Sequence, residues 1–171
     1  MNKTDFKLKV FSLSERLYPM VARMLGNATS TEDAIQDIMM KLWEKRKQVE
    51  HHPNISGFVF LTARNYCIDV LRKKKYPVDD ATPYLHVLKS GGDHNGVEFK
   101  ELNNIIQNVL KTLPEQQQEV FNMRDIDGYE FTEIAAALDI KVEHARVLLS
   151  RARKQIGVAL ENTYNYEKGQ Y

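Results

Sequence analysis

The sequence is poor in residues that build covalent, metal-dependent or membrane-spanning structures. Only one of its 171 residues is a cysteine, which excludes an internal disulfide and any zinc site with several cysteines. No apolar run approaches the roughly 18 residues that a membrane helix needs. The N-terminal segment contains lysines but no sustained apolar core, so we expect neither a signal peptide nor membrane insertion. These absences predict a protein of a reducing compartment, the cytoplasm.

Net charge is also nearly absent, but the charges are unevenly distributed. The chain has 24 Lys and Arg against 23 Asp and Glu. Residues 1–76 carry 14 basic and 8 acidic side chains, residues 98–140 carry 3 and 9, and residues 141–154 carry 5 and 1. Two basic segments therefore flank an acidic one, so that a polyanion could contact the chain in two separate places.

Proline and glycine are scarce outside one segment. Residues 77–96 hold two of the five prolines and three of the eight glycines, without a sustained period of either kind. The rest of the chain has helical periodicity, and no strand pattern with turn punctuation is present. The sequence therefore predicts an all-α fold of two small helical domains, residues 1–76 and 98–171, joined by a flexible linker over 77–97.

The first domain contains a helix that we expect to begin near Ser30, an N-cap residue followed by an acidic first turn. Pro19 is expected to bend or restart the helix before it. Apolar residues at spacings of three and four predict a buried stripe made of Ala34, Ile35, Ile38, Met39, Leu42 and Trp43. A second, polar stripe is expected to be exposed and consists of Asp33, Gln36, Asp37 and Met40.

A second long helix is predicted over residues 57–75. Its core side would hold Phe60, Ala63, Cys67 and Leu71. At 100° per residue, the opposite side would carry Phe58, Thr62, Asn65, Asp69 and Arg72. This second side combines an aromatic ring, amide and hydroxyl groups and a cation, which are the groups that hold unstacked bases and backbone phosphates. Alternatively, Phe58 is a core residue and the basic run at 72–75 complements the helix dipole.

The second domain opens with helices over 98–113 and from Pro114 to about Arg124, and ends with a helix-turn-helix pattern. Helices are predicted over 131–138 and 141–160, with the turn at Asp139. The last helix would bury Ala145, Leu148, Leu149, Ala152 and Ile156. Its outer side would expose Glu143, His144, Val147, Ser150, Arg151 and Lys154, flanked by Arg146 and Arg153. On an isolated helix this would be a solvated basic face, but in a helix-turn-helix it suits a DNA major groove.

Three segments together resemble one protein family. The stretch LPEQQQEVFNMRDIDGYEFTEIAAALDIKVEHARVLLSRARKQI resembles region 4, the promoter-reading domain of bacterial sigma factors. STEDAIQDIMMKLWEKRKQV resembles the polymerase-binding helix of their region 2, and NISGFVFLTARNYCIDVLRKKK the adjoining helix that opens the minus-ten element. The chain lacks room for the extra regions of primary sigma factors. It is identified as a member of the extracytoplasmic-function (ECF) type. The sequence VEHARVLLSRARKQI most resembles members from Bacteroidetes.

Two positions depart from the family pattern. Asp139 stands where the turn usually has Gly, and Asp tolerates the left-handed backbone at a modest cost. Glu130 stands where the residue before the first helix of the motif is usually Ser or Thr, so we expect a weaker cap there.

The resemblance implies a role for each group of residues. The minus-thirty-five element would be bound by Lys141, His144, Arg146, Ser150, Arg151, Arg153 and Lys154. The minus-ten element would be bound by Phe58, Thr62, Asn65, Arg72, Lys73, Lys74 and Lys75, with the loop His51–Ile55 closing a pocket for a flipped base at Asn65. The partners would be promoter DNA, core RNA polymerase through its β′ clamp helices and β flap, and an anti-sigma factor. The β′ clamp helices would be contacted by Asp33, Gln36, Asp37 and Met40.

Two other functions explain less of the sequence. A stand-alone helix-turn-helix regulator would leave the first 76 residues unexplained. A helical hydrolase or metal enzyme would need a catalytic constellation, and the five histidines show no metal-ligand or triad spacing with carboxylates. Cys67 falls on an apolar helix face and is expected to be an inert core residue. We therefore predict no enzymatic activity, no metal and no cofactor.

Overall fold

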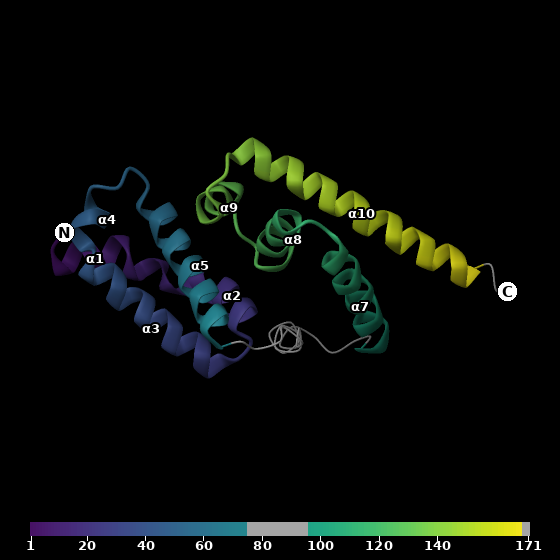
Figure 1. Ribbon diagram of the computed structural model, residues 1–171, viewed down its shortest axis with the longest axis horizontal. Helices are drawn as coiled ribbons and strands as arrows, with labels where there is room; N and C mark the ends of the chain where they lie inside the picture. Colours follow the sequence, from purple (N-terminus) through teal and green to yellow (C-terminus); the bar gives the residue numbers. More distant parts are fainter. Residues whose placement is uncertain (75–95, 169–171) are drawn as a thin grey trace. The chain divides into compact units, whose positions relative to one another are not determined.

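The computed structural model describes residues 1–74 and 96–168, and their regular structure is entirely helical (Figure 1). The all-α prediction is confirmed. The described helices belong to two compact units, which we call the N-terminal unit and the C-terminal unit. The predicted linker, residues 77–97, lies outside the described residues except for its last two positions, which begin the first helix of the C-terminal unit.

The N-terminal unit is a bundle of three main helices with three shorter ones. Its elements are α1 (Lys3–Lys9), η1 (Phe11–Leu13), α2 (Ser14–Leu25), α3 (Ala28–Glu44), α4 (Arg46–Glu50) and α5 (Ile55–Lys74). Helices α2, α3 and α5 pack against one another in pairs. Their common core includes Leu17, Met20, Val21, Ile38, Leu42, Val59 and Phe60, each fully buried. Burial of each such side chain contributes about 1.5–3 kcal/mol.

Helix α3 begins three residues earlier than the sequence predicted. Its N-cap is Asn27, whose side chain accepts a hydrogen bond from the Ser30 amide at 2.8 Å. The expectation of an N-cap at Ser30 is therefore wrong. Asn27 can serve as the cap because Gly26, at φ 84°, ends α2 in the left-handed conformation directly before it. The buried Thr31 then bonds back to the Asn27 carbonyl at 2.7 Å.

Pro19 lies inside α2 and does not restart the helix. The chain restarts earlier, where α1 ends at Lys9 and the short η1 leads into Ser14. Proline removes one backbone hydrogen bond from a helix interior. Here the residues around it, Leu17 and Met20, are fully buried, and their packing offsets that loss.

The C-terminal unit is built around one long helix. Its main elements are α7 (Gly96–Thr112), α8 (Glu115–Phe121), the π-helical turn η2 (Asn122–Ile126) and α10 (Val142–Lys168). In the sequence, α9 (Phe131–Leu138) lies between η2 and α10. Both α7 and α8 pack against α10 (Figure 1). Helix α10 extends eight residues beyond the predicted end at 160, since residues 161–168 contain no proline or glycine to stop it.

Candidate nucleic-acid and protein interfaces

Helices α9 and α10 form the predicted helix-turn-helix. Asp139 adopts φ 54°, so the turn uses the left-handed backbone that the sequence required of it. The Ile140 amide closes the end of α9 by donating to the Ala135 carbonyl at 2.9 Å. Ile134 and Ala135 before the turn and Ala145 after it are buried.

The start of α9 is held by acidic side chains instead of a Ser or Thr cap. The Glu133 carboxylate reaches back and accepts a hydrogen bond from the Glu130 amide at 2.8 Å, which is half of a capping box. The Glu130 carboxylate lies 3.1 Å from the Arg124 guanidinium. Arg124 also donates to the Tyr129 carbonyl at 2.7 Å. The weak cap at Glu130 is thus supplemented from Arg124 and Glu133.

Helix α10 has the two faces that its periodicity predicts. Ala145, Leu148, Leu149, Ala152 and Ile156 are buried. The residues that the sequence assigned to the minus-thirty-five element are all exposed, namely Lys141, His144, Arg146, Ser150, Arg151, Arg153 and Lys154. Val147 is exposed among them. A helix of this kind presents cations and hydroxyls to a groove while its apolar face stays in the core.

Two of these arginines have partners that the sequence did not reveal. Arg153 forms a two-pronged ion pair with Asp125, through Nε to Oδ2 at 2.9 Å and Nη2 to Oδ1 at 2.5 Å. This hydrogen bond raises the pKa of Arg153. The Arg146 guanidinium lies over the Phe131 ring, 5.3 Å from its centroid. No local spacing links residue 125 to 153 or 131 to 146, so helical periodicity alone could not have found these pairs.

The polar stripe of α3 is exposed as predicted. Asp33, Gln36 and Asp37 are exposed, and Met40 is 63% exposed. Asp37 accepts a hydrogen bond from the Tyr66 hydroxyl of α5 at 2.7 Å. Burial, and then the bond to Asp37, raises the pKa of Tyr66 to about 12. One carboxylate of the stripe is therefore held in place by α5, a contact that the sequence analysis missed.

The outer side of α5 divides into a half-buried part and an exposed part. Phe58 and Thr62 are half-buried, whereas Asn65 is exposed. Further along, Arg72, Lys73 and Lys74 are exposed, and Arg72 lies 3.8 Å from Asp69. Lys75, which the sequence assigned to the same set, lies outside the described residues.

The loop before α5 is fixed against this side. Asn54 caps α5 by accepting from the Gly57 amide at 2.8 Å, and His52 Nδ1 lies 2.7 Å from the Asn54 carbonyl oxygen. The His52 ring contacts Phe58, with centroids 5.1 Å apart. The loop thus covers one end of the α5 side through Phe58.

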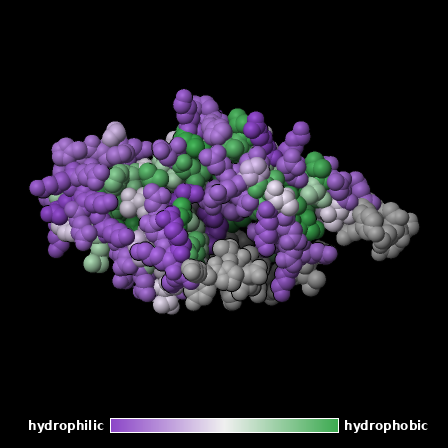
Figure 2. Space-filling model, viewed as in Figure 1, coloured by the Kyte–Doolittle hydropathy of each residue, from purple (hydrophilic) through white to green (hydrophobic). Residues whose placement is uncertain are grey.

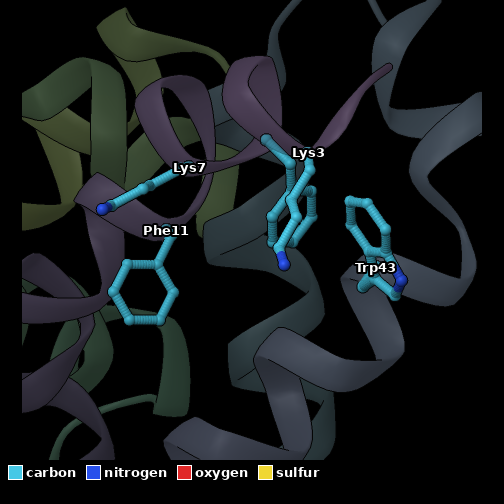
Figure 3. A pocket seen from close by; sticks show the side chains of 5 residues that line it. Lys3, Lys7, Phe11 and Trp43 are labelled. Carbon is cyan, nitrogen blue, oxygen red and sulfur yellow. The ribbon is translucent and has the colours of Figure 1, made fainter.

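A pocket of about 660 Å³ opens between α1, η1 and α3 of the N-terminal unit (Figure 3). It is lined by Lys3, Phe6, Lys7, Phe11 and Trp43. The Phe6 and Trp43 rings meet edge to face, with centroids 5.0 Å apart and planes at 83°. Arg46 lies over the Trp43 ring at 4.6 Å. Trp43, which the sequence placed in the core stripe, is therefore half-buried and borders this pocket.

The described residues show no arrangement typical of a metal or membrane site. Among residues 1–74 and 96–168 no three His, Cys, Asp or Glu side chains gather closely enough to hold a metal ion. Cys67 is buried, and burial raises its pKa to about 12, which keeps the thiol protonated. No helix in the described part of the chain is long and apolar enough to cross a bilayer. On the face shown in Figure 2, hydrophilic side chains predominate, with smaller hydrophobic patches between them.

Comparison with known proteins agrees with this geometry. Residues 12–76 match the family model of sigma-70 region 2, and residues 103–156 match that of sigma-70, region 4. The chain is 27% identical over 152 residues to the ECF RNA polymerase sigma factor SigW of Bacillus subtilis, covering 83% of this chain and 81% of that protein. It is 25% identical over 162 residues to the ECF RNA polymerase sigma-E factor of Escherichia coli, covering 88% and 84%.

Solved structures share the fold. CnrH, determined in complex with the cytosolic domain of CnrY, superposes with a TM-score of 0.60 at 21% identity, covering 94% of this chain and 90% of that one. The sigma factor RpoE of Bartonella quintana, determined with the anti-sigma factor NepR, gives 0.59 at 19% identity, covering 92% and 98%. The chain belongs to the ECF group of the sigma-70 family, whose members are non-enzymatic factors that direct transcription initiation.

Proposed function

We propose that this sigma factor divides promoter recognition between its two units. In this proposal residues 98–171 read the minus-thirty-five element and residues 1–76 bind core polymerase and open the minus-ten element. The observation that carries the proposal is the exposed basic face of α10 within a helix-turn-helix, on a chain whose other unit matches region 2. A stand-alone DNA-binding regulator would have no use for that second unit.

Reading of the minus-thirty-five element is assigned to the outer face of α10. Arg151 and Ser150 lie on the side turned away from the buried Ala145, Leu149 and Ala152. Arginine pairs with guanine edges in the major groove and serine with several bases, whereas lysines at the ends of the face suit phosphates. Lys141 and Lys154, at the two ends of this face, are therefore assigned to the DNA backbone.

Opening of the minus-ten element is assigned to the outer side of α5. An exposed amide at Asn65 can bond a base edge, and Phe58 next to His52 offers an aromatic surface at the other end of the same side. The exposed cations at Arg72, Lys73 and Lys74 suit the backbone of the separated strand. Because these groups act on unpaired bases, they contribute after the duplex begins to open.

Binding of core polymerase is assigned to the exposed stripe of α3. Asp33, Gln36 and Asp37 offer carboxylates and an amide to a basic partner surface, and the exposed Met40 can adapt to its shape. The β′ clamp helices are the proposed contact, and the β flap is the proposed contact of the C-terminal unit. Tyr66 supports this surface by holding the Asp37 carboxylate.

An anti-sigma factor is a further proposed partner. Two structurally similar proteins, CnrH and RpoE, were each determined with a protein partner, and the partner of RpoE is an anti-sigma factor by name. Action in the cytoplasm follows from the need to meet polymerase and chromosomal DNA. The similarity to sigma factors from Bacteroidetes rests only on the sequence of residues 142–156 and stays a prediction.

The direct test is initiation in a reconstituted system. Core RNA polymerase, the full chain and a library of promoter fragments would be mixed, and the fragments that yield transcripts sequenced. We expect enrichment of two spaced elements that core polymerase alone does not select. Enrichment of a single duplex element without polymerase would instead identify a stand-alone regulator, and no enrichment would refute the proposal.

A further inference from the structure

The segment between α8 and α9 has a rigid backbone. Helix α8 runs into the π-helical turn η2, where the Asp127 amide donates to the Asn122 carbonyl at 2.8 Å. The Tyr129 amide then donates to the Met123 carbonyl at 2.9 Å, and both Met123 and Tyr129 are fully buried. Single π-helical turns of this kind are common at functional sites. Two side chains that leave this rigid segment contact arginines of α10.

The first contact joins Asp125 to Arg153. The Arg153 Nε and Nη2 groups donate to the two oxygens of one carboxylate, which is the two-pronged geometry that fixes an arginine most firmly. The Asp125 side chain is 24% exposed and that of Arg153 is 56% exposed. The pair lies at the surface, and the negative charge of the carboxylate largely compensates that of the guanidinium. Arg153 is therefore a poor phosphate ligand as long as this pair exists.

The second contact joins Phe131 to Arg146. Two guanidinium groups lie over the Phe131 ring, that of Arg124 at 5.0 Å from its centroid and that of Arg146 at 5.3 Å. Arg124 is anchored by the Tyr129 carbonyl and by Glu130. Arg146 is exposed and has no carboxylate partner among the described residues, so its charge remains available. The ring orients this arginine without neutralising it.

We propose that the rigid segment Arg124–Phe131 positions α10 on DNA and divides the roles of its two flanking arginines. Arg153 is a structural tie to Asp125, whereas Arg146, oriented by Phe131, is the arginine that binds a backbone phosphate. Asp125 and Phe131 are accordingly positioning residues, which act through the two arginines. This inference rests on the proposed function, because it concerns the same contact between α10 and the minus-thirty-five element.

The competing arrangement would release Arg153 to a phosphate when DNA binds. Release would leave the Asp125 carboxylate without its partner, close to the polyanion. An unpaired carboxylate beside the DNA backbone repels phosphate, which weakens binding in the released arrangement. The geometry therefore favours keeping the pair intact on DNA.

A charge swap separates the two arrangements. Holoenzyme would be assembled with wild-type chain, Arg153→Ala, Arg146→Ala and the double variant Asp125→Arg/Arg153→Asp, and promoter affinity measured from low to high salt. We expect Arg153→Ala to lower affinity roughly threefold to tenfold without changing the salt slope. The swap should restore affinity to within about twofold of wild type, since the tie is rebuilt in reverse. Arg146→Ala should reduce the slope by about 0.9.

The result that overturns the proposal is a reduced salt slope for Arg153→Ala, together with a swapped variant that folds normally but does not regain affinity or slope. If the swapped variant did not fold, judged by helicity and thermal midpoint, the slopes of the two single arginine variants would decide. Equal slope losses would then place Arg153 on a phosphate and overturn the proposal. The variants are compared only after wild-type holoenzyme has initiated on its promoter, so a failure of the proposed function shows separately.

Two variants of Phe131 test whether its ring acts through Arg146. Phe131→Tyr keeps the ring face and should retain wild-type affinity and salt slope. Phe131→Leu keeps apolar volume but removes the ring, and should weaken binding about threefold, with no further loss when Arg146→Ala is already present. Additive losses in the double variant would show that Phe131 does not act through Arg146.

Discussion

In the N-terminal unit the proposed binding residues lie on the outer sides of α3 and α5, whose inner sides build the core. On α3, Asp37 is exposed and its neighbour Ile38 is fully buried. On α5, Asn65 is exposed and Phe60 is fully buried. In the C-terminal unit the outer face of α10 depends in addition on a distant segment, through Asp125 and Phe131. The first site is set by helix packing and by one side-chain bond, from Tyr66 to Asp37, whereas two arginines of the second site are held by contacts from a separate segment.

The largest expected effect breaks the packing of the N-terminal unit. Leu42→Ala removes a fully buried side chain from α3 and should lower the free energy of unfolding by about 2–5 kcal/mol, because it leaves a cavity between α2, α3 and α5. Urea denaturation followed by circular dichroism would measure the loss. The matched control is Met40→Ala on the exposed side of the same helix, where a comparable loss would contradict the assigned faces.

The second prediction concerns base reading by the C-terminal unit. Arg151→Ala should cost roughly 1–3 kcal/mol of binding on the matched minus-thirty-five element and much less on a scrambled one. Competition binding with holoenzyme would measure both, with Lys154→Ala as the control for a backbone contact that weakens both equally. Equal losses for Arg151→Ala would show that it only grips phosphate, and reading would pass to Ser150 or His144.

The third prediction concerns opening by the N-terminal unit. Asn65→Ala should leave promoter recruitment nearly intact and weaken the open complex by about 1–3 kcal/mol, because a base-binding amide acts only on separated strands. Permanganate reactivity of minus-ten thymines would report opening, and gel-shift binding would report recruitment. Thymine reactivity at the wild-type level would remove Asn65 from the site.

The smallest expected effect concerns the polymerase contact. Asp37→Lys reverses one charge of the exposed α3 stripe and should weaken core polymerase binding by about 1 kcal/mol, more at low salt than at high salt. Fluorescence anisotropy of labelled chain would measure it. Tyr66→Phe separates the causes, since it removes only the bond to Asp37 and should have a lesser effect. Unchanged affinity for Asp37→Lys would detach this stripe from polymerase.

The spacing of apolar residues predicted most of the buried and exposed positions on individual helices. The buried and exposed sides of α3, α5 and α10 follow from the spacing of residues such as Ala34, Ala63 and Ala145, because a helix in a two-sided environment repeats its burial every three to four positions. The first residues of helices were harder to predict. Two good capping residues, Asn27 and Ser30, compete three positions apart, and the left-handed Gly26 decides for the first.

Contacts between residues far apart in the chain could not be predicted from the sequence. The pairs Asp125 with Arg153, Phe131 with Arg146 and Tyr66 with Asp37 join different elements. Their partners are fixed by how the helices cross, which a single sequence does not encode at a recognisable spacing. The Trp43 pocket was missed for the same reason, since it exists only where α1 and η1 pass beside α3.

The assignment of one promoter element to each unit can be tested by measuring initiation rates for each combination of protein variant and promoter. Holoenzymes with wild-type chain, Arg151→Ala or Asn65→Ala would be assayed on promoters with either element altered separately. The account predicts that Arg151→Ala becomes insensitive to changes in the minus-thirty-five element only, and Asn65→Ala to changes in the minus-ten element only. If each variant lost discrimination at both elements, or at the opposite one, the assignment of the two faces would be contradicted.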